Sequence, residues 1–447
     1  MTQNALTDRY LEAFAQSGLS ARELVDQLIS STVDTTYNGK MLTRPGFLER
    51  AQVDQLEADL EMLYSCVTSL PNRLFGGDLG AFAASTGMTP EQVSAVVRGR
   101  GSAPSRLARA DLYIDEAGFR VMEMNMSSAL GGVDNMALNR AMAKQPFIAE
   151  FLQANNLGYA DTMLEVAETL FAECKVPSGT RPVVALCDWP ASFATLEPQL
   201  RTNVAVFDAL GIEALPCHIG QLRLEDDSIW LGDRKIEVIY RLFLMEDLLD
   251  PTGPALIDPV LQAAERGNVA IFSPMDAELY SSKGALALLS DESNRHLFSA
   301  EELATLDRFL PWTRMVRSGP VTVEDGRSVS LEEYALTERT ELILKPTLLH
   351  GGMGVVPGWQ TEPEEWRRLI DSAMDEQFVL QRRIHPFTES FPKLDGPGTE
   401  EWVVLWGGFL GARGYSGMLL RGTSKSDAGV LNMTTGAIAS CCFHELG

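Results

Sequence analysis

Polar side chains that can bind a cation recur at every second position in one short stretch of the sequence. Arg109 and Asp111 precede a turn signal at residues 116–118, and Glu123 and Asn125 follow it. We interpret the stretch as a β-hairpin with a three-residue loop, in which Asp111 lies opposite Glu123 and Arg109 lies opposite Asn125. Residues i and i+2 share one face of a strand, so all four side chains are expected to project together.

Two carboxylates directly opposite each other repel, so something positive must lie between them. Two acidic groups and an amide oxygen are hard oxygen ligands that suit Mg²⁺. An exposed strand face with ordinary scattered charges, or a local ion pair with Arg109, explains the same spacing equally well. Both interpretations stay open at this point, and both depend on the register, which also pairs Tyr113 with Val121.

A second signal is a lysine followed by a glycine-rich turn. Lys345 ends an apolar run at 342–345, and residues 350–354 read His-Gly-Gly-Met-Gly. Backbone N–H groups of such a turn can surround phosphate oxygens while the lysine supplies a point charge. The turn is not a Walker A loop, because no Gly-Lys-Ser/Thr follows. Taken alone it is more typical of a tight surface loop, and Lys283, which opens an apolar helix, is more typical of a solvated helix start.

Hydrophobic spacing predicts the elements that position these motifs. Residues 51–70 carry one apolar stripe at three- and four-residue spacing, typical of an amphipathic helix. Thr89 followed by Pro90 predicts a helix start, and residues 138–172 are also predicted to be helical. The first hundred residues are therefore interpreted as helices joined by short polar turns.

The remainder of the chain alternates strands and helices. Strands are predicted at 182–187, 212–216, 236–240 and 269–272, with a helix at 200–210 and a hairpin at 222–235. This pattern predicts an α/β layer with a partly parallel sheet. Beyond the helix at Lys283, we predict a helix at 362–374 and strands at 342–345, 378–381, 402–405, 409–415, 416–421 and 429–432. No Gly-x-Gly-x-x-Gly opens the first helix of the α/β layer, which argues against a dinucleotide site.

Composition excludes some classes of partner. The 447 residues include 61 Asp+Glu and 37 Lys+Arg, so the formal charge is −24. This charge argues against nucleic acid or an anionic membrane as a partner and favours an amine-bearing ligand. The sequence contains no run of about 18 apolar residues, the length that would predict a membrane span. The N-terminus lacks the pattern of a secretory signal. The six cysteines form no CxxC pair and are interpreted as reduced and mostly buried. We expect a cytoplasmic protein.

Together these pieces resemble the circularly permuted ATP-grasp ligases, the branch that includes glutathionylspermidine synthase and eukaryotic glutathione synthetase. In that branch a metal-binding Glu-x-Asn strand precedes the phosphate-binding lysine and glycine loop in the chain. Here Glu123-Met124-Asn125 precedes Lys345 and the loop in the same way. The likeness extends to residues 282–288, 378–384 and 417–421, so it touches elements over most of the chain.

The resemblance implies ATP and Mg²⁺ as cofactors and assigns roles to individual residues. Asp111, Glu123 and Asn125 are the implied Mg²⁺ ligands, while Arg109 and Arg421 resemble arginines that hold the phosphoryl group and the acyl-phosphate. The implied nucleotide-binding residues are the lysines Lys283 and Lys345, the loop residues His350, Gly351, Gly352, Met353 and Gly354, and the adenine-reading hinge strand Gln381, Arg382, Arg383 and Ile384.

Two departures from the family pattern narrow the expectation. Relatives often carry an acidic residue in the glycine loop, where this chain has His350, so no metal ligand is expected from the loop. Asn125 is followed by Met-Ser-Ser-Ala-Leu-Gly-Gly and not by the Asp-Thr-Pro frequent in glutathionylspermidine synthase, which points away from a polyamine substrate. Within the branch, the sequence most resembles ligases of peptide-antibiotic biosynthesis, such as the pheganomycin-type peptide ligase.

The expected activity is ATP-dependent ligation of a small-molecule carboxylate donor to an amine or peptide acceptor through an acyl-phosphate, with release of ADP and phosphate. The alternatives are a phosphotransferase on the same fold and a non-catalytic nucleotide-binding regulatory protein. The donor pocket is expected to use residues 127–132 and either Arg241 or Glu246, by position. A homodimer is expected because dimers are common among such ligases.

The resemblance also implies an overall architecture. We expect an α/β (α+β) protein with an ATP-grasp fold and a permuted order of elements. Residues 1–175 would form an N-terminal helical region plus the metal-binding hairpin. Residues 176–276 would form a substrate-side α/β domain, and residues 277–447 the nucleotide-binding domain.

Overall fold

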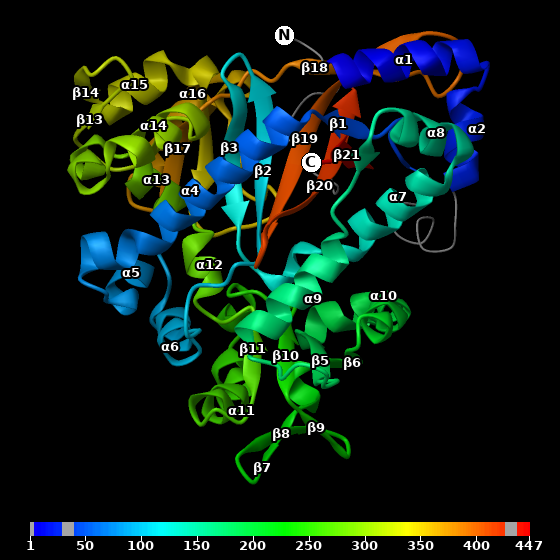
Figure 1. The fold of residues 1–447 in the computed structure, drawn as a ribbon. Coiled ribbons are helices and arrows are strands. Elements are labelled where there is room, and N and C mark those ends of the chain that lie inside the picture. Colours follow the sequence, from blue (N-terminus) through cyan, green and yellow to red (C-terminus); the bar gives the residue numbers. More distant parts are fainter. Residues whose placement is uncertain (1–3, 29–39, 425–435) are drawn as a thin grey trace.

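The computed structural model describes residues 4–28, 40–424 and 436–447, and its largest sheet joins strands from both ends of the chain. The strands are β1 (Gly46–Leu48), β2 (Ala108–Asp115), β3 (Gly118–Asn125), β4 (Leu157–Gly158), β18 (Thr388–Pro392), β19 (Thr399–Gly411), β20 (Gly414–Ser424) and β21 (Ile438–Glu445). Their order is β1-β21-β20-β19-β2-β3, with β18 beside β19 and β4 beside β21 (Figure 1). The hairpin of β2 and β3 therefore lies at one edge of this eight-stranded sheet.

The inner half of the hairpin has the predicted register. Asp111 lies opposite Glu123, and Arg109 lies opposite Asn125. Because β2 also pairs with β19, which brings Gly407 opposite Asp111, the two acidic side chains are held in a sheet and not in an isolated hairpin. An isolated two-stranded hairpin is only marginally stable.

The predicted loop of the hairpin is wrong by one residue. Gly118 (φ +104°) pairs with Asp115, so the loop holds residues 116 and 117 only. Tyr113 consequently lies opposite Arg120 and not opposite Val121. A register shift between residues 111 and 112 restores the predicted pairing nearer the site.

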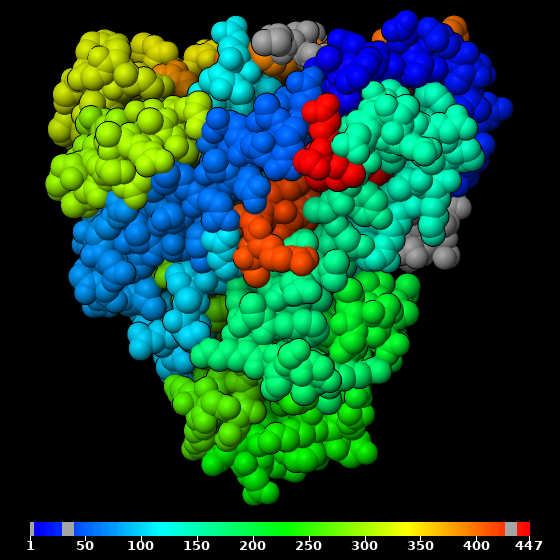
Figure 2. Space-filling model, viewed as in Figure 1, coloured from blue at the N-terminus to red at the C-terminus, as the bar shows by residue number. Residues whose placement is uncertain are grey.

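Both faces of the large sheet are covered. On one face Trp406 and Leu420 pack in one core with Leu60 of α4 (Arg50–Phe75). On the other face Phe409 and Leu419 pack against α1 (Ala5–Ser17), α2 (Ala21–Leu28), α7 (Val133–Lys144) and α8 (Pro146–Ala154). In Figure 2, viewed from the α4 side, the turn between β19 and β20 reaches the surface between the covering helices. The predicted stripe of α4 is buried as expected, with Val53, Leu56, Leu60, Leu63 and Val67 inside.

The predicted helix at 138–172 is broken into shorter elements. A new helix, α8, begins at Pro146 and ends at Ala154 with Asn155 as its C-cap, and the next residue, Asn156, has a positive φ of 52°. The two residues of β4 follow, and α9 (Thr162–Glu173) begins after the N-cap Asp161. The short strand β1 is likewise absent from the sequence prediction; it is three residues long and exists because it pairs with β21.

The region 183–272 forms the expected α/β layer, which lies below the large sheet in Figure 1. Its sheet has the order β11-β10-β5-β6, and all its pairs are parallel. The elements are β5 (Val183–Asp188), α10 (Pro190–Ala209), β6 (Glu213–His218), β10 (Val238–Arg241), α11 (Gly253–Glu265) and β11 (Ala270–Phe272), with β7 (Arg223–Glu225), β8 (Ser228–Leu231) and β9 (Arg234–Ile236) in place of the predicted hairpin. Helix α10 begins ten residues before the prediction, since Pro190 suits a first helical turn.

A second four-stranded sheet, β12-β17-β15-β16, lies at the upper left of Figure 1. Its strands are β12 (Thr313–Met315), β15 (Leu342–Pro346), β16 (Val356–Pro357) and β17 (Phe378–Arg382). The core beneath it contains Leu344, Leu380 and the fully buried Trp366 of α16 (Pro363–Ala373). The strand predicted at 429–432 lies outside the described residues.

The other elements surround these sheets. They are α5 (Leu79–Ser85), α6 (Pro90–Arg98), α12 (Ala277–Tyr280), α13 (Lys283–Ser290), α14 (Ala300–Phe309), α15 (Leu331–Thr337), β13 (Pro320–Thr322) and β14 (Ser328–Ser330). Helix α6 begins at Pro90 with Thr89 as its N-cap, as predicted. The six cysteines are all free, and five of them are buried. In the described ranges, no helix has the length and apolar character needed to cross a bilayer.

A carboxylate at the end of α9 helps to fix the start of β2. Glu173 accepts hydrogen bonds from the Ser105 hydroxyl (3.0 Å) and from the Arg106 backbone N–H. Burial raises the pKa of Glu173 to about 7, although these hydrogen bonds oppose the shift. The folded state therefore retains a proton that the unfolded chain loses at a lower pH, and the associated stability is lost as pH rises toward 7.

We predict that Glu173→Gln, which keeps the neutral form, raises the melting temperature relative to wild type more at pH 8 than at pH 5. Glu168→Gln on the exposed face of the same helix is the matched control and should show no such difference. Thermal melts followed by circular dichroism at both pH values test this. An equal effect of Glu173→Gln at both pH values would contradict it.

Candidate functional site

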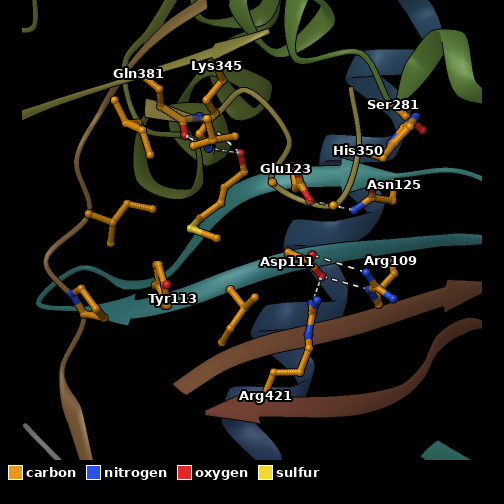
Figure 3. Close-up of a pocket in the computed structure, with 18 of the residues that line it drawn as sticks. Arg109, Asp111, Tyr113, Glu123, Asn125, Ser281, Lys345, His350, Gln381 and Arg421 are labelled. Atoms are coloured by element: carbon orange, nitrogen blue, oxygen red, sulfur yellow. Dashed lines mark hydrogen bonds and ion pairs between the residues drawn. The ribbon is translucent and has the colours of Figure 1, made fainter. Parts of the chain in front are cut away.

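A cavity of about 510 Å³ lies between the large sheet and the sheet that carries β15 and β17. Figure 3 shows side chains from β2, β3, β15, β17 and β20 pointing into it. It brings together the following residues of the predicted site: Arg109, Asp111, Glu123, Asn125, Lys345, His350, Gly351, Gly352, Gln381, Arg382, Arg383, Ile384 and Arg421. Residues as far apart in the sequence as Asp111 and Arg421, which are separated by 310 positions, thus meet in one pocket.

Strand alternation explains why these side chains face the same way. In antiparallel pairing Asp111 lies opposite Glu123 on one side and opposite Gly407 on the other, so side chains at matching positions project from one face. Gly407 leaves room for the Arg109 side chain, because a Cβ there would lie 3.1 Å from Arg109 Cδ. The sheet therefore supplies both the acidic pair and the space for its counterion.

Asp111 is neutralised by two arginines. Its Oδ1 accepts from Arg109 Nε at 2.9 Å and from Arg421 Nη2 at 2.6 Å, and its side chain is almost fully buried. The ion pair with Arg109 that the sequence left open is therefore present, and Arg421 of β20 adds to it. Arg421 Nε is a buried donor for which the described residues provide no acceptor.

Glu123 is neutralised by lysines instead. Its Oε2 lies 3.3 Å from Lys283 Nζ, and its Oε1 accepts from Asn125 Nδ2 at 3.4 Å. Burial alone would raise the pKa of Glu123, but Lys283 and Lys345 hold it below its usual range, so the carboxylate is ionised. The interpretation of Lys283 as a solvated helix start is wrong: its side chain is 6% exposed.

Lys345 faces the cavity from β15. Its Nζ donates to Gln381 Oε1 at 2.7 Å, which fixes the ammonium beside the hinge strand. Burial lowers the pKa of Lys345 to about 8, although Glu123 opposes the shift. Four cationic side chains, Arg109, Lys283, Lys345 and Arg421, thus surround two carboxylates, and the site is locally positive in an acidic protein.

Two side-chain contacts restrain the glycine loop, residues 350–354. Lys283 Nζ donates to the Leu349 carbonyl oxygen at 2.8 Å, and His350 Nε2 lies 3.4 Å from Glu278 Oε2. Gly351, Gly352 and Gly354 all have positive φ, between 64° and 77°, so the loop conformation depends on glycine. Met353 is 51% exposed, and neither Met353 nor Gly354 lines the cavity.

The hinge strand, residues 381–384, lies among apolar side chains and presents little unpaired charge to the cavity. The Arg382 side chain pairs with Glu324, and the Arg383 guanidinium stacks over the Trp359 ring at 4.1 Å. Ile384 and Trp359 line the cavity together with Ile343, Val355 and Leu405. These side chains form an apolar slot, and an apolar slot suits a heteroaromatic ring.

The acidic pair also fits a divalent metal by the chemistry of its donors. Asp111, Glu123 and Asn125 present two carboxylates and an amide oxygen on one face, the oxygen ligands that Mg²⁺ takes. In the described part of the chain, no three His, Cys, Asp or Glu side chains converge, so a metal here would draw its remaining ligands from a bound substrate or water.

The residues expected in a donor pocket differ in whether they line the cavity. Ser127 lines the cavity, whereas Arg241 is fully buried and paired with Glu278, and Glu246 is not part of the lining. Sequence reasoning missed Trp359, Leu244 and Ser281 as lining residues. It also missed Glu278, whose role is visible only once Arg241 and His350 are placed beside it.

Comparisons with known proteins support the fold. No family model matches the sequence, and no curated protein sequence matches it. A solved structure of a glutathione synthetase-like effector from Globodera pallida, in the apo form, is similar over 98% of this chain and 96% of its own, with a TM-score of 0.58 and 12% identity. A D-alanyl-alanine synthetase A from Vibrio cholerae matches over 51% of this chain and 68% of its own, with a TM-score of 0.25 and 8% identity. The chain has an ATP-grasp-like fold.

We predict that His350→Ala speeds hydrogen exchange of the loop amides at 350–355 in the nucleotide-free protein by about 3- to 10-fold, because a hydrogen bond to a charged group is lost. Hydrogen–deuterium exchange with mass spectrometry measures this directly. His296→Ala, in a segment remote from the loop in the sequence, is the control. Unchanged exchange in the His350 variant would show that the contact with Glu278 does not restrain the loop.

Proposed function

We propose that the protein is an ATP-dependent carboxylate–amine ligase that forms an amide bond through an acyl-phosphate. The observation that carries the proposal is the group of four cations around the Asp111–Glu123 pair, at the inner end of an apolar slot. Excess positive charge around fixed carboxylates suits a polyphosphate accompanied by a divalent metal.

The nucleotide is proposed to lie along the cavity. Its adenine would occupy the apolar slot beside Trp359 and Ile384, next to the backbone of β17. Its phosphates would extend toward Lys345 and Lys283, below the loop at 350–354. Bound phosphate would compete for the Lys283 ammonium, which now donates to the Leu349 carbonyl oxygen.

The chemistry requires charge stabilisation more than a side-chain nucleophile. The donor carboxylate attacks the γ-phosphorus, ADP leaves, and an amine then displaces phosphate from the acyl-phosphate. Arg109 and Arg421 would orient the donor carboxylate and the transferred phosphoryl group, and Lys345 would offset negative charge on the phosphoryl group. Mg²⁺, held by Asp111, Glu123 and Asn125, would supply Lewis-acid polarisation of the phosphates.

The order of the strands and loops along the chain bears on which branch of these ligases the protein belongs to. The Glu123–Asn125 strand precedes the Lys345 loop in the chain, which supports placement in the permuted branch. The changed segment after Asn125 supports a peptide ligase of the peptide-antibiotic type, acting on an amine or peptide N-terminus. We further propose that the ranges 1–175, 176–276 and 277–447 act as domains and that the protein is a homodimer.

Phosphate release tests the activity. A ligase releases phosphate from ATP only when both a carboxylate and an amine are present, so single omissions from mixtures of acids and amines should abolish release. A phosphotransferase would form ADP with one substrate and release no phosphate. Nucleotide binding without turnover in any mixture would support the regulatory alternative.

We predict that Glu123→Gln lowers turnover by at least about 100-fold while the fold is retained, because it removes a metal-binding charge. Coupled measurement of ADP formation tests this, with circular dichroism as the check on folding. Glu116→Gln, in the exposed turn of the same hairpin, is the matched control and should retain wild-type turnover. ADP formation at the wild-type rate by Glu123→Gln would refute the metal assignment.

A further inference from the structure

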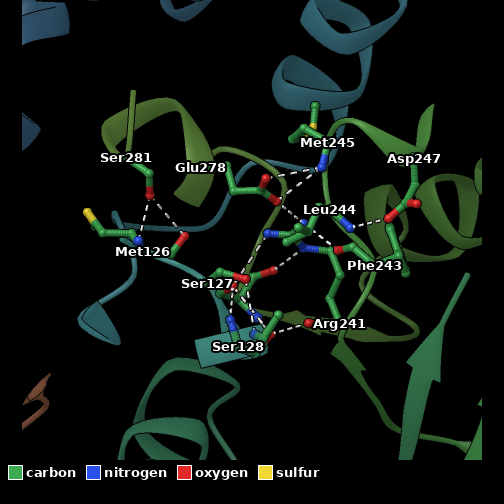
Figure 4. A network of polar contacts seen from close by, with 12 residues as sticks. Met126, Ser127, Ser128, Arg241, Phe243, Leu244, Met245, Asp247, Glu278 and Ser281 are labelled. Carbon is green, nitrogen blue, oxygen red and sulfur yellow. Dashed lines mark hydrogen bonds and ion pairs between the residues drawn. The ribbon is translucent and has the colours of Figure 1, made fainter. Parts of the chain in front are cut away.

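The end of the cavity beyond Asn125 is where the carboxylate donor must lie if the nucleotide occupies the rest. This end is formed by Met126, Ser127, Ala129, Leu130, Leu244 and Ser281. Figure 4 shows Leu244 beside the 126–128 segment, and Figure 3 shows Ser281 and Arg109 at the end of the pocket away from Gln381. The chemical character of these side chains therefore bears on which donor fits.

The charged groups behind this end of the cavity bind one another and the neighbouring backbone. Arg241 Nε donates to the Ser273 carbonyl oxygen at 3.0 Å, and Arg241 Nη1 donates to the Phe243 carbonyl oxygen at 3.0 Å and pairs with Glu278 (Figure 4). Glu278 also accepts from the Met245 backbone N–H at 3.1 Å. Both charged side chains are almost fully buried, so neither offers a charge to a ligand.

The hydroxyl groups at this end are also engaged. Ser127 Oγ accepts from the Ala129 backbone N–H at 3.0 Å, and Ser281 Oγ accepts from the Met126 backbone N–H at 2.5 Å. These contacts fix the 126–130 turn, and the other side chains that line this end, Met126, Ala129, Leu130 and Leu244, are all apolar. The surface that remains is apolar.

Among the side chains that the structure describes, the cation at this end is Arg109. Its Nη1 donates to the Leu130 carbonyl oxygen at 3.0 Å, which holds the turn beside the guanidinium. The carboxylates among the described residues that line the cavity are Asp111 and Glu123, and both are already paired with cations. Three N–H groups of Arg109 donate to Asp111 and to the Leu130 carbonyl oxygen, and a guanidinium has further N–H groups. A donor carboxylate can therefore still bind Arg109, whereas a free α-ammonium group meets only carboxylates that already have cations.

We propose that the donor is a carboxylic acid whose carbon next to the carboxyl group carries an apolar, uncharged substituent, such as an N-acylated apolar amino acid. A free α-ammonium group would lose its hydration beside Arg109 without an opposing charge, and a second carboxylate would face carbon atoms. This inference rests on the proposed function and specifies the substrate class of the same site.

Trapping with hydroxylamine tests the proposal without knowledge of the natural acceptor. The donor carboxylate takes the γ-phosphoryl group from ATP and ADP leaves. The hydroxylamine nitrogen then attacks the acyl carbon, phosphate leaves, a proton is released, and a hydroxamate forms. The acids compared are N-acetyl-L-leucine, L-leucine, N-acetyl-L-glutamate and L-glutamate, with MgATP and the full chain.

The expected result is that N-acetyl-L-leucine gives hydroxamate at least about 10-fold faster than each of the other three acids, since each of those places an unpaired charge in the apolar end. An equal or faster rate with L-leucine or with either glutamate would overturn the substrate class and leave the ligase proposal intact. No hydroxamate from any of the acids would count against both.

A charge placed in the apolar end gives a second readout. Leu244→Asp supplies a carboxylate for an α-ammonium group, so the rate with L-leucine relative to N-acetyl-L-leucine should rise by about 10-fold. Leu249→Asp is the matched control, because Leu249 is 55% exposed and does not line the cavity. An unchanged ratio in a folded Leu244→Asp variant would contradict the placement of the donor.

Discussion

Two carboxylates, Asp111 and Glu123, face each other across β2 and β3, and the site is organised around offsetting their repulsion. Each acid receives its own cations. Arg109 and Arg421 contact Asp111, whereas Lys283 contacts Glu123. Since each carboxylate is desolvated, removal of any one cation leaves a buried charge less well compensated, which is costly.

The distribution of these cations in the fold explains why so many elements must come together. Arg421 reaches Asp111 only because β20 pairs with β19 and β19 pairs with β2. Lys283 reaches Glu123 from the first residue of α13. The cations exceed the two acids in number, so the pocket is locally positive although the whole chain carries a charge of −24. Bulk charge therefore does not decide the ligand of a buried site.

The sequence was sufficient for features that depend on local spacing. Alternation at 109–125 predicted the facing pair, because the side-chain period of a strand is two; the loop was placed wrongly, yet the register shift after Asp111 preserved the pairing. Lys345 at a strand end, the glycine turn and the parallel strands of the α/β layer also followed from local pattern.

Features that depend on tertiary partners were not predictable in this way. Lys283 looked like a surface residue, because nothing near it in the sequence indicates that Glu123 and the Leu349 carbonyl oxygen will surround its ammonium. Arg241 looked available to substrate, because its partner Glu278 is 37 residues away. The Arg382 side chain pairs with Glu324, which is 58 residues away, and β1 exists only through its pairing with β21.

The central claim is that the site transfers a phosphoryl group from ATP to a carboxylate. The most direct measurement follows the carboxylate oxygen during turnover of an ¹⁸O-labelled acid, such as N-acetyl-L-leucine, with MgATP and an amine. The account predicts that one ¹⁸O atom appears in the released phosphate, visible as an isotope shift in the ³¹P NMR spectrum, because the acyl-phosphate breaks at its C–O bond. Turnover that leaves the released phosphate unlabelled would contradict it.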